Sequence, residues 1–258
     1  MSRLTLAVAL LLVSGTALAD ADHPEADCAK IKNYAAAGDR AYKAKQYDKA
    51  RDSYIEQVGW SETCQLPDSV IATAYNNVAL TLIRQGQYSK ARAWLMIQEQ
   101  DAKSQYNLNL IKEKLAALPA PAGPEGEYWQ YAGRGMWNSY VIKKAGKKYT
   151  LNFDGVYAGL MAMYYGPNIG SLQGDVAIAD NQGVFHQGSE TSAESESQCD
   201  ISLTFTSESL TTRVGGIVAL GTMFPRRGSI VGCSNYNGEL QKDIFYKINR
   251  RGKLFHTG

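Results

Sequence analysis

Asn76-Asn-Val-Ala-Leu-Thr-Leu-Ile-Arg-Gln-Gly-Gln-Tyr-Ser-Lys-Ala-Arg-Ala-Trp-Leu95 is the stretch that decides the fold of the N-terminal half. Its small and apolar residues recur at helical spacing on both sides of Gly86, which indicates two helices joined by a short turn. The same pattern occurs upstream, between Ala37 and Tyr54. Two copies of one helical hairpin predict a repeat module, and such modules bind other molecules.

The N-terminus has the features of a secretory signal peptide. Arg3 supplies a positive charge, residues 4–13 form an apolar run, and Ala17-Leu-Ala19 is a cleavage site. We therefore expect residues 1–19 to be removed and the mature protein to be periplasmic, with other secreted locations as the alternative. The apolar run is too short for a membrane-spanning helix, so no integral membrane span is expected.

The four cysteines divide evenly between the two halves of the chain, as Cys28 and Cys64 and as Cys199 and Cys233. An even number in an oxidising compartment favours disulfides. Pairing within each half predicts Cys28–Cys64 and Cys199–Cys233. A metal site is the alternative, but no CxxC motif or paired histidine accompanies these residues.

Helical spacing continues along the N-terminal half as far as residue 118. Asp27 is the expected N-cap of the first helix, and residues 59–64 are expected to form an irregular connector. The predicted helices cover about 27–45, 48–58, 69–85, 88–104 and 105–117. Residues 119–126 contain three prolines, which cannot continue a helix and favour an extended linker. We therefore expect a helical domain over 20–118 and a second domain over 127–258.

Both helical hairpins resemble tetratricopeptide repeats. The matching residues are Gly38, Ala41, Tyr47, Ala50 and Tyr54 in the first copy, and Ala79, Leu82, Tyr88, Ala91 and Leu95 in the second. In such modules the first helix of each pair forms a concave face. On that face Asn76 and Asn77 could hold a peptide backbone, and Arg40 or Arg84 a carboxylate. Ordinary helix surface is the alternative interpretation.

After the linker the hydrophobic period changes from 3.6 to 2, which is typical of strands. The predicted strands cover about 128–131, 136–142, 148–153, 175–179, 184–186, 201–206, 210–214, 229–234 and 242–249. This half is therefore expected to be an antiparallel β sandwich or barrel, which makes the whole chain α+β with two domains.

The β half resembles small secreted domains of bacterial envelope proteins that include lysozyme inhibitors. The residues that carry this resemblance are Gly174, Asp180, Asn181, Cys199, Leu203, Phe205, Leu210, Cys233, Asn237 and Gly238. The resemblance implies a domain that binds an envelope-acting enzyme. Glu190, Glu194 and Glu196 could form an acidic arm toward a basic partner, and a solvated loop is the alternative.

Catalytic chemistry has little support in the sequence. The three histidines, His23, His186 and His256, stand apart from each other, and no nucleophile elbow, HExxH helix or phosphate loop is present. We expect no catalytic residues, no metal and no cofactor. A net charge of +2 argues against a nucleic-acid partner.

The sequence therefore predicts a non-enzymatic, protein-binding protein, with its oligomeric state left open. The first hypothesis is an inhibitor or immunity protein that binds an envelope-acting enzyme or toxin. The alternative is an envelope assembly adaptor that binds a protein segment through its repeats. Two apolar stretches, 156–166 and 215–225, are expected in the core, or else as a partner surface or a surface docked on the repeats.

Overall fold

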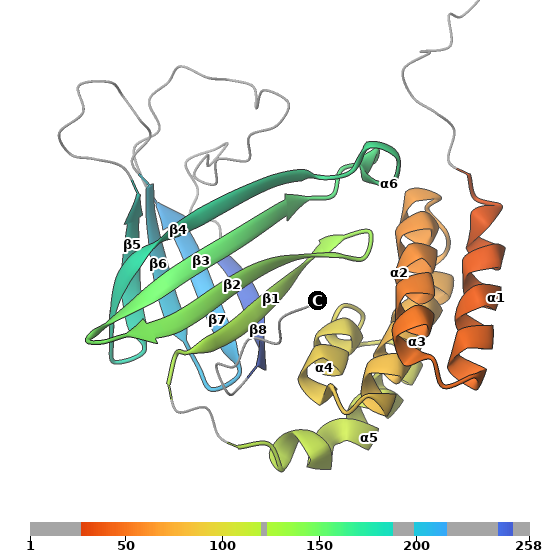
Figure 1. The fold of residues 1–258 in the computed structure, drawn as a ribbon, viewed down its shortest axis with the longest axis horizontal. Helices are drawn as coiled ribbons and strands as arrows, with labels where there is room; N and C mark the ends of the chain where they lie inside the picture. The colour runs from red at the N-terminus through yellow and green to blue at the C-terminus, as the bar shows by residue number, and fades with distance from the viewer. Residues whose placement is uncertain (1–26, 120–122, 188–198, 216–241, 250–258) are drawn as a thin grey trace, which may run out of the picture.

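The fold is a helical region followed by a closed β-barrel (Figure 1). The computed structural model describes residues 27–119, 123–187, 199–215 and 242–249. The predicted α+β architecture with two parts is confirmed, and of the two options for the second part, the barrel is the one observed. The strand predicted at 229–234 lies outside the described residues.

The helical region consists of two antiparallel hairpins and a further helix. Helix α1 (Lys30–Lys43) pairs with α2 (Tyr47–Thr63), α3 (Asp68–Arg84) pairs with α4 (Tyr88–Met96), and α5 (Ala102–Ala116) packs beside α3 and α4. Their turns need positive φ, as the sequence pattern predicts at Gly86, where φ is +73°.

The core of this region lies where small residues bring the helices together. Ala50, Ala79 and Ala91 are completely buried beside larger side chains such as Leu95. At Gly38 even a single Cβ atom would overlap the ring of Tyr54, so the first hairpin needs glycine there. The positions singled out in the two sequence copies therefore form the helix contacts.

The end of α2 differs from the sequence prediction. Residues 59–64 are not an irregular connector, because α2 continues to Thr63 and Cys64 is its C-cap. Gly59 is tolerated inside this helix because it packs against Met163 of the second domain, which overrides its weak helix propensity. Tertiary packing, which no local pattern reveals, decides this boundary.

The helix predicted over 88–104 ends at Met96, and the chain turns before α5 begins. The carboxylate of Asp101 accepts hydrogen bonds at 3.0 Å from the backbone N–H groups of Lys103 and Ser104. Asp101 is therefore the N-cap that starts α5 three residues earlier than predicted. Asp27, by contrast, is not the N-cap of α1. Ala29 occupies that position, with no side-chain cap.

Within the described residues the barrel has eight antiparallel strands, each paired with the next one described along the chain. They are β1 (Gly126–Gly133), β2 (Met136–Ala145), β3 (Lys148–Tyr157), β4 (Asn168–Ala179), β5 (Gln182–Gln187), β6 (Cys199–Phe205), β7 (Ser209–Gly215) and β8 (Lys242–Asn249). The barrel closes where β8 pairs with β1. Lys247 of β8 is fully buried at this seam, donates to the carbonyl of Gly123 at 2.9 Å and lies over the ring of Tyr128.

Alternation along the strands fills the barrel interior with apolar side chains. The buried cluster includes Tyr128, Tyr140, Ile142, Leu151, Leu172, Val176, Phe185, Ile201, Leu203, Phe205 and Leu210. The turn between β4 and β5 consists of Asp180 and Asn181, whose φ angles are +49° and +60°. Two consecutive positive φ values are typical of the tight hairpin turn that matches strand twist.

The apolar stretch 156–166 extends β3 and then forms the short helix α6 (Ala162–Tyr165), which reaches the helical region (Figure 1). The rings of Tyr164 and Trp60 of α2 meet edge to face, with their centroids 5.2 Å apart. Part of this stretch is therefore docked on the helices, which was one of the predicted alternatives. Tyr157, Leu160 and Tyr165 remain exposed.

An aromatic cluster joins the helices to the outside of the barrel. Trp94 of α4 lies between Tyr75 of α3 and Tyr131 of β1, and its ring centroid is 5.1 Å from that of Trp137 in β2. Trp129 of β1 extends the cluster against Trp137 at 5.2 Å. The Trp94–Trp137 pair is edge to face and the others are tilted, and such ring contacts add to the free energy gained by burying large rings.

A carboxylate from α2 fixes the same interface. Glu62 accepts hydrogen bonds from the hydroxyls of Tyr75, at 2.5 Å, and Tyr131, and from the backbone N–H of Arg134 at 2.5 Å. Burial, followed by this neighbouring carboxylate, raises the pKa of Tyr131 far above its ordinary value. On the other side of the interface Arg92 of α4 pairs with Glu208.

Candidate functional site

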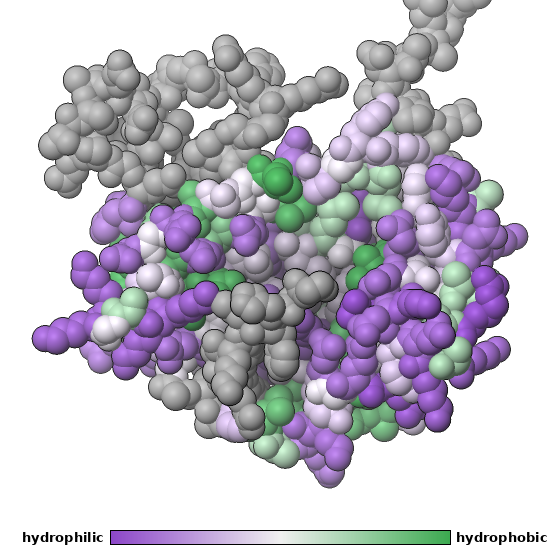
Figure 2. All heavy atoms as spheres, viewed as in Figure 1, coloured by the Kyte–Doolittle hydropathy of each residue, from purple (hydrophilic) through white to green (hydrophobic). Residues whose placement is uncertain are grey.

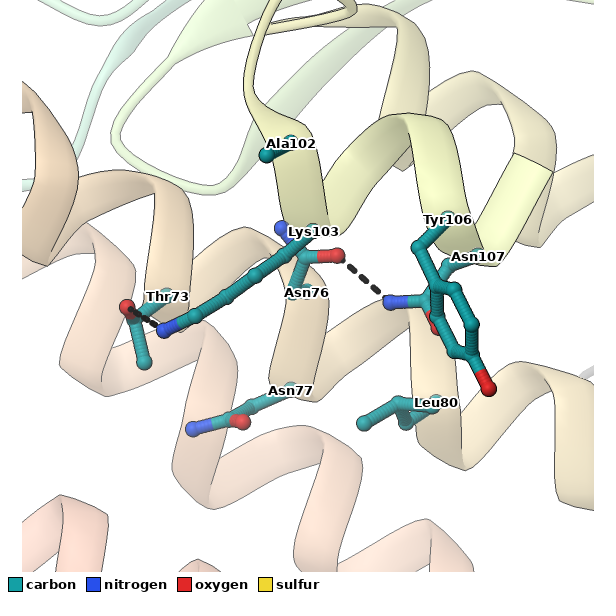
Figure 3. Close-up of a pocket in the computed structure, with 8 residues that line it drawn as sticks. All are labelled: Thr73, Asn76, Asn77, Leu80, Ala102, Lys103, Tyr106 and Asn107. Atoms are coloured by element: carbon teal, nitrogen blue, oxygen red, sulfur yellow. Dashed lines mark hydrogen bonds between the residues drawn. The ribbon is translucent and has the colours of Figure 1, made fainter. Parts of the chain in front are cut away.

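Helices α3 and α5 form a surface groove with a volume of about 390 Å³ (Figure 3). Both helices run side by side, and residues about three and four apart on each point into the same space. The lining side chains are Thr73, Asn76, Asn77 and Leu80 from α3, and Ala102, Lys103, Tyr106 and Asn107 from α5.

Asn76 forms the floor of this groove and holds the two helices together. Its amide nitrogen donates to the Ala72 carbonyl at 2.9 Å and to the Ser104 hydroxyl at 3.0 Å. Its amide oxygen accepts from the side chain of Asn107 at 2.6 Å, and Asn76 is only 3% exposed. Asn76 was predicted to hold a peptide backbone, but its polar atoms are used inside the protein, so its role here is to position α5.

The rim of the groove is polar at one end and apolar at the other. Lys103 donates to the Thr73 hydroxyl at 3.1 Å, and within the described parts of the chain no carboxylate forms an ion pair with it. Asn77 is half-buried on the wall, as Figure 3 shows, and no other described residue hydrogen-bonds to its amide. Tyr106 is 65% exposed.

These groups suit an extended peptide more than a small molecule. An amide such as Asn77 can pair with the N–H and C=O of a peptide bond, and the ammonium of Lys103 can bind a carbonyl or a carboxylate. The exposed ring of Tyr106 and the side chain of Leu80 offer apolar surface to a partner side chain.

Arg40 and Arg84 lie outside the groove lining. Arg84, at the end of α3, donates from Nε to the hydroxyl of Tyr42 at 2.8 Å, and this hydrogen bond raises the pKa of its guanidinium. It therefore ties α3 to α1. Arg40 is exposed on α1. Their predicted role as carboxylate ligands stays a prediction.

The Cys28–Cys64 disulfide is formed, with the two Cα atoms 6.0 Å apart, as predicted. The predicted partner of Cys199, Cys233, lies outside the described residues, and so do Glu190, Glu194 and Glu196. The acidic-arm hypothesis and the second disulfide therefore stay predictions.

The barrel presents a second hollow, of about 650 Å³, on the outer face of β5, β6 and β7. Its lining is mixed, with polar side chains such as Ser202 and Thr204, the apolar Val184, and the charged Arg213. His186 pairs with Asp200 through Nδ1 at 2.7 Å, and both side chains are exposed. Across the described ranges, no group of three metal-ligating side chains is present.

Of the residues that line the groove, the sequence prediction named Asn76 and Asn77 as site residues and missed the whole α5 side, including Lys103 and Tyr106. The predicted helix boundary at residue 105 left Lys103 at the end of the preceding helix, away from α3. The missed signal was Asp101, a good N-cap residue, followed by the stripe Lys103, Tyr106, Asn107 and Leu110 at helical spacing. Recognising that cap would have placed this stripe on one helix beside Asn77.

Comparison of the chain with known protein families, curated proteins and solved structures gives no match. Within the described ranges, no helix has both the length and the apolar character needed to span a membrane. The geometry of the groove is therefore the basis for the functional conclusion.

Proposed function

We propose that this protein binds an extended segment of another protein in the α3–α5 groove, without catalysing a reaction. The observation that carries the proposal is that one groove holds Asn77, whose amide has no hydrogen-bond partner among the described residues, together with the exposed Lys103 and Tyr106. These three side chains offer a backbone ligand, a charge and an apolar anchor within one site.

The arrangement of the helices supports a tetratricopeptide-type stack as the scaffold of this site. Two hairpins, α1–α2 and α3–α4, follow one another, and α5 covers the second as a terminal helix would. A stack of this length is short for independent stability. The Cys28–Cys64 disulfide and the docked barrel supply additional stabilisation.

An adaptor that holds a partner segment in the periplasm is the form of this function that the groove favours. Inhibition of an envelope-acting enzyme or toxin, or immunity to it, would use the acidic residues Glu190, Glu194 and Glu196, and no described contact bears on them. The adaptor function is therefore the one we put forward for testing.

The proposal is tested by capture of partners from a periplasmic extract, with the chain from residue 20 to 258 as bait. Tyr106→Ala and Lys103→Ala should each weaken capture of the specific partner by about tenfold or more, because anchor residues dominate binding energy. Lys112→Ala is the matched control, since it removes the same charge from an exposed position elsewhere on α5. Capture that the two groove variants leave unchanged would contradict the proposal.

A further inference from the structure

The last turn of α2 is the place where the N-terminal residues, the helices and the barrel meet. Cys64 is bonded there to Cys28, just ahead of α1. In the same turn, Glu62 accepts the backbone N–H of Arg134 at 2.5 Å, and Thr63 accepts from Nε of the same arginine at 3.2 Å. Arg134 lies in the turn between β1 and β2. The disulfide is thus attached to the helix turn that contacts the barrel.

The residues that flank Cys28 also contact this junction between α2 and the barrel. The backbone N–H of Asp27 donates to the hydroxyl of Tyr164 at 3.2 Å, and the ammonium of Lys30 lies 4.8 Å from the ring centroid of Trp60. Trp60 is 3% exposed and contacts the ring of Tyr164 on the barrel side. The start of α1 is therefore linked to the barrel side by a row of contacts, from Lys30 to Trp60 and from Trp60 to Tyr164.

Among the described residues, the other local restraints on the first turn of α1 are the bonds from the N–H groups of Lys30 and Ile31 to the carbonyls of Asp27 and Cys28, and an exposed Lys30–Asp27 ion pair. The N-cap residue of α1, Ala29, makes no side-chain hydrogen bond to the free N–H groups of the helix. An uncapped helix end frays easily, and the free energy of such local opening is low. A covalent bond between Cys28 and the end of α2 is the strongest restraint on this turn.

We propose that the Cys28–Cys64 disulfide is a redox-sensitive latch that couples the start of α1 to the docking of the barrel on α2. A dithiol reductant opens it. The disulfide takes up two electrons and two protons, which gives two thiols, and the dithiol becomes a disulfide. The first turn of α1 then frays, and Lys30 no longer lies over the ring of Trp60. As a result, the hydrogen bonds from Arg134 to Glu62 and Thr63, in the last turn of α2, become weaker.

Hydrogen exchange on the full chain tests this inference. The backbone N–H of Arg134 is the direct reporter, because it donates across the interface to Glu62 of α2. The N–H of Gly135 is the indirect reporter, since it donates to the Tyr131 hydroxyl, which itself donates to Glu62. In the double variant Cys28→Ala/Cys64→Ala their exchange should become about tenfold faster or more. Strands β6 and β7 should keep their exchange rates, and Lys32→Ala, an exposed change on α1, should leave the two reporters unchanged.

Exchange that rises only over residues 27–31 would overturn the inference, since the disulfide would then restrain α1 alone. If the double variant fails to fold, the unmodified chain is treated with dithiothreitol, and the fraction of Cys28 and Cys64 that becomes alkylated is followed by mass spectrometry. The exchange at Arg134 and Gly135 should rise in step with that fraction and fall again on reoxidation. Reduction without this rise would equally overturn the inference.

Discussion

A single carboxylate carries much of the contact between the two halves of the molecule. Glu62 accepts hydrogen bonds from two tyrosine hydroxyls and one backbone N–H, and Tyr75 and Tyr131 also stack edge to face at 5.6 Å. A carboxylate with several donors forms stronger hydrogen bonds than a neutral acceptor does. Tyr131 connects Glu62 to the turn between β1 and β2, since its hydroxyl also accepts a hydrogen bond from the N–H of Gly135.

Glu62→Ala should therefore destabilise the protein markedly. The change leaves the hydroxyls of Tyr75 and Tyr131 without their acceptor, and we expect a loss of about 3 kcal/mol in the free energy of unfolding. Urea unfolding measures this loss. Glu56→Ala, an exposed change on the same helix, should stay within about 0.5 kcal/mol of the parent. Equal effects of the two variants would show that Glu62 is not the key contact.

At the scale of elements, the pairing of α3 with α5 depends on a small buried polar network. Asn76 and Asn107 hydrogen-bond to each other at 2.6 Å, and Ser104 contributes a third partner. Buried polar networks fix the register of two helices because each member has a defined partner. The width of the groove therefore follows from side chains below its surface.

Asn107→Ala should lower stability and distort the groove together. It removes one partner of Asn76 and leaves a buried oxygen unsatisfied, which costs about 1–3 kcal/mol. Thermal unfolding followed by circular dichroism measures the change in stability. Asn109→Ala is the matched control, because Asn109 is an exposed asparagine on the same helix. A loss in the control as large as that in Asn107→Ala would refute the role of the network.

Much of this element-level organisation could be predicted from local patterns. The helical hairpins, the Asp180-Asn181 turn and most strands follow from spacing and turn chemistry, because both act between near neighbours in sequence. The continuation of α2 through Gly59 could not be predicted, since Met163 of a distant segment stabilises it. The groove was predicted on the α3 side at Asn77. The α5 side was missed because one N-cap, Asp101, was not recognised.

At the scale of the whole molecule, the two halves share one continuous contact. The aromatic cluster around Trp94 includes Tyr131, whose hydroxyl donates to Glu62 of α2, so this cluster adjoins the contacts of α2 with the β1–β2 turn. Figure 2 shows polar residues over much of the surface on both sides of the junction, with apolar residues gathered in patches between them. Burial of large rings at such a junction links the stability of one half to that of the other.

The two halves should therefore unfold together in one cooperative transition. Tryptophan fluorescence reports the interface, and far-ultraviolet circular dichroism reports the helices. In urea their midpoints should coincide for the parent chain. Trp137→Ala removes the central ring of the barrel side and should separate the two midpoints. Separate midpoints in the parent chain would show that the halves are independent.

Closure of the barrel has a consequence for the order in which the chain folds. The seam joins β1 to β8, which are far apart in sequence, and Lys247 reaches back to Gly123 across it. The helices rest on contacts between near neighbours, whereas the seam needs the closure of a long loop, which is slow. We expect the helices to form first and to offer a docking surface to the β1–β2 hairpin. The helical region then acts as a template on which the barrel is assembled.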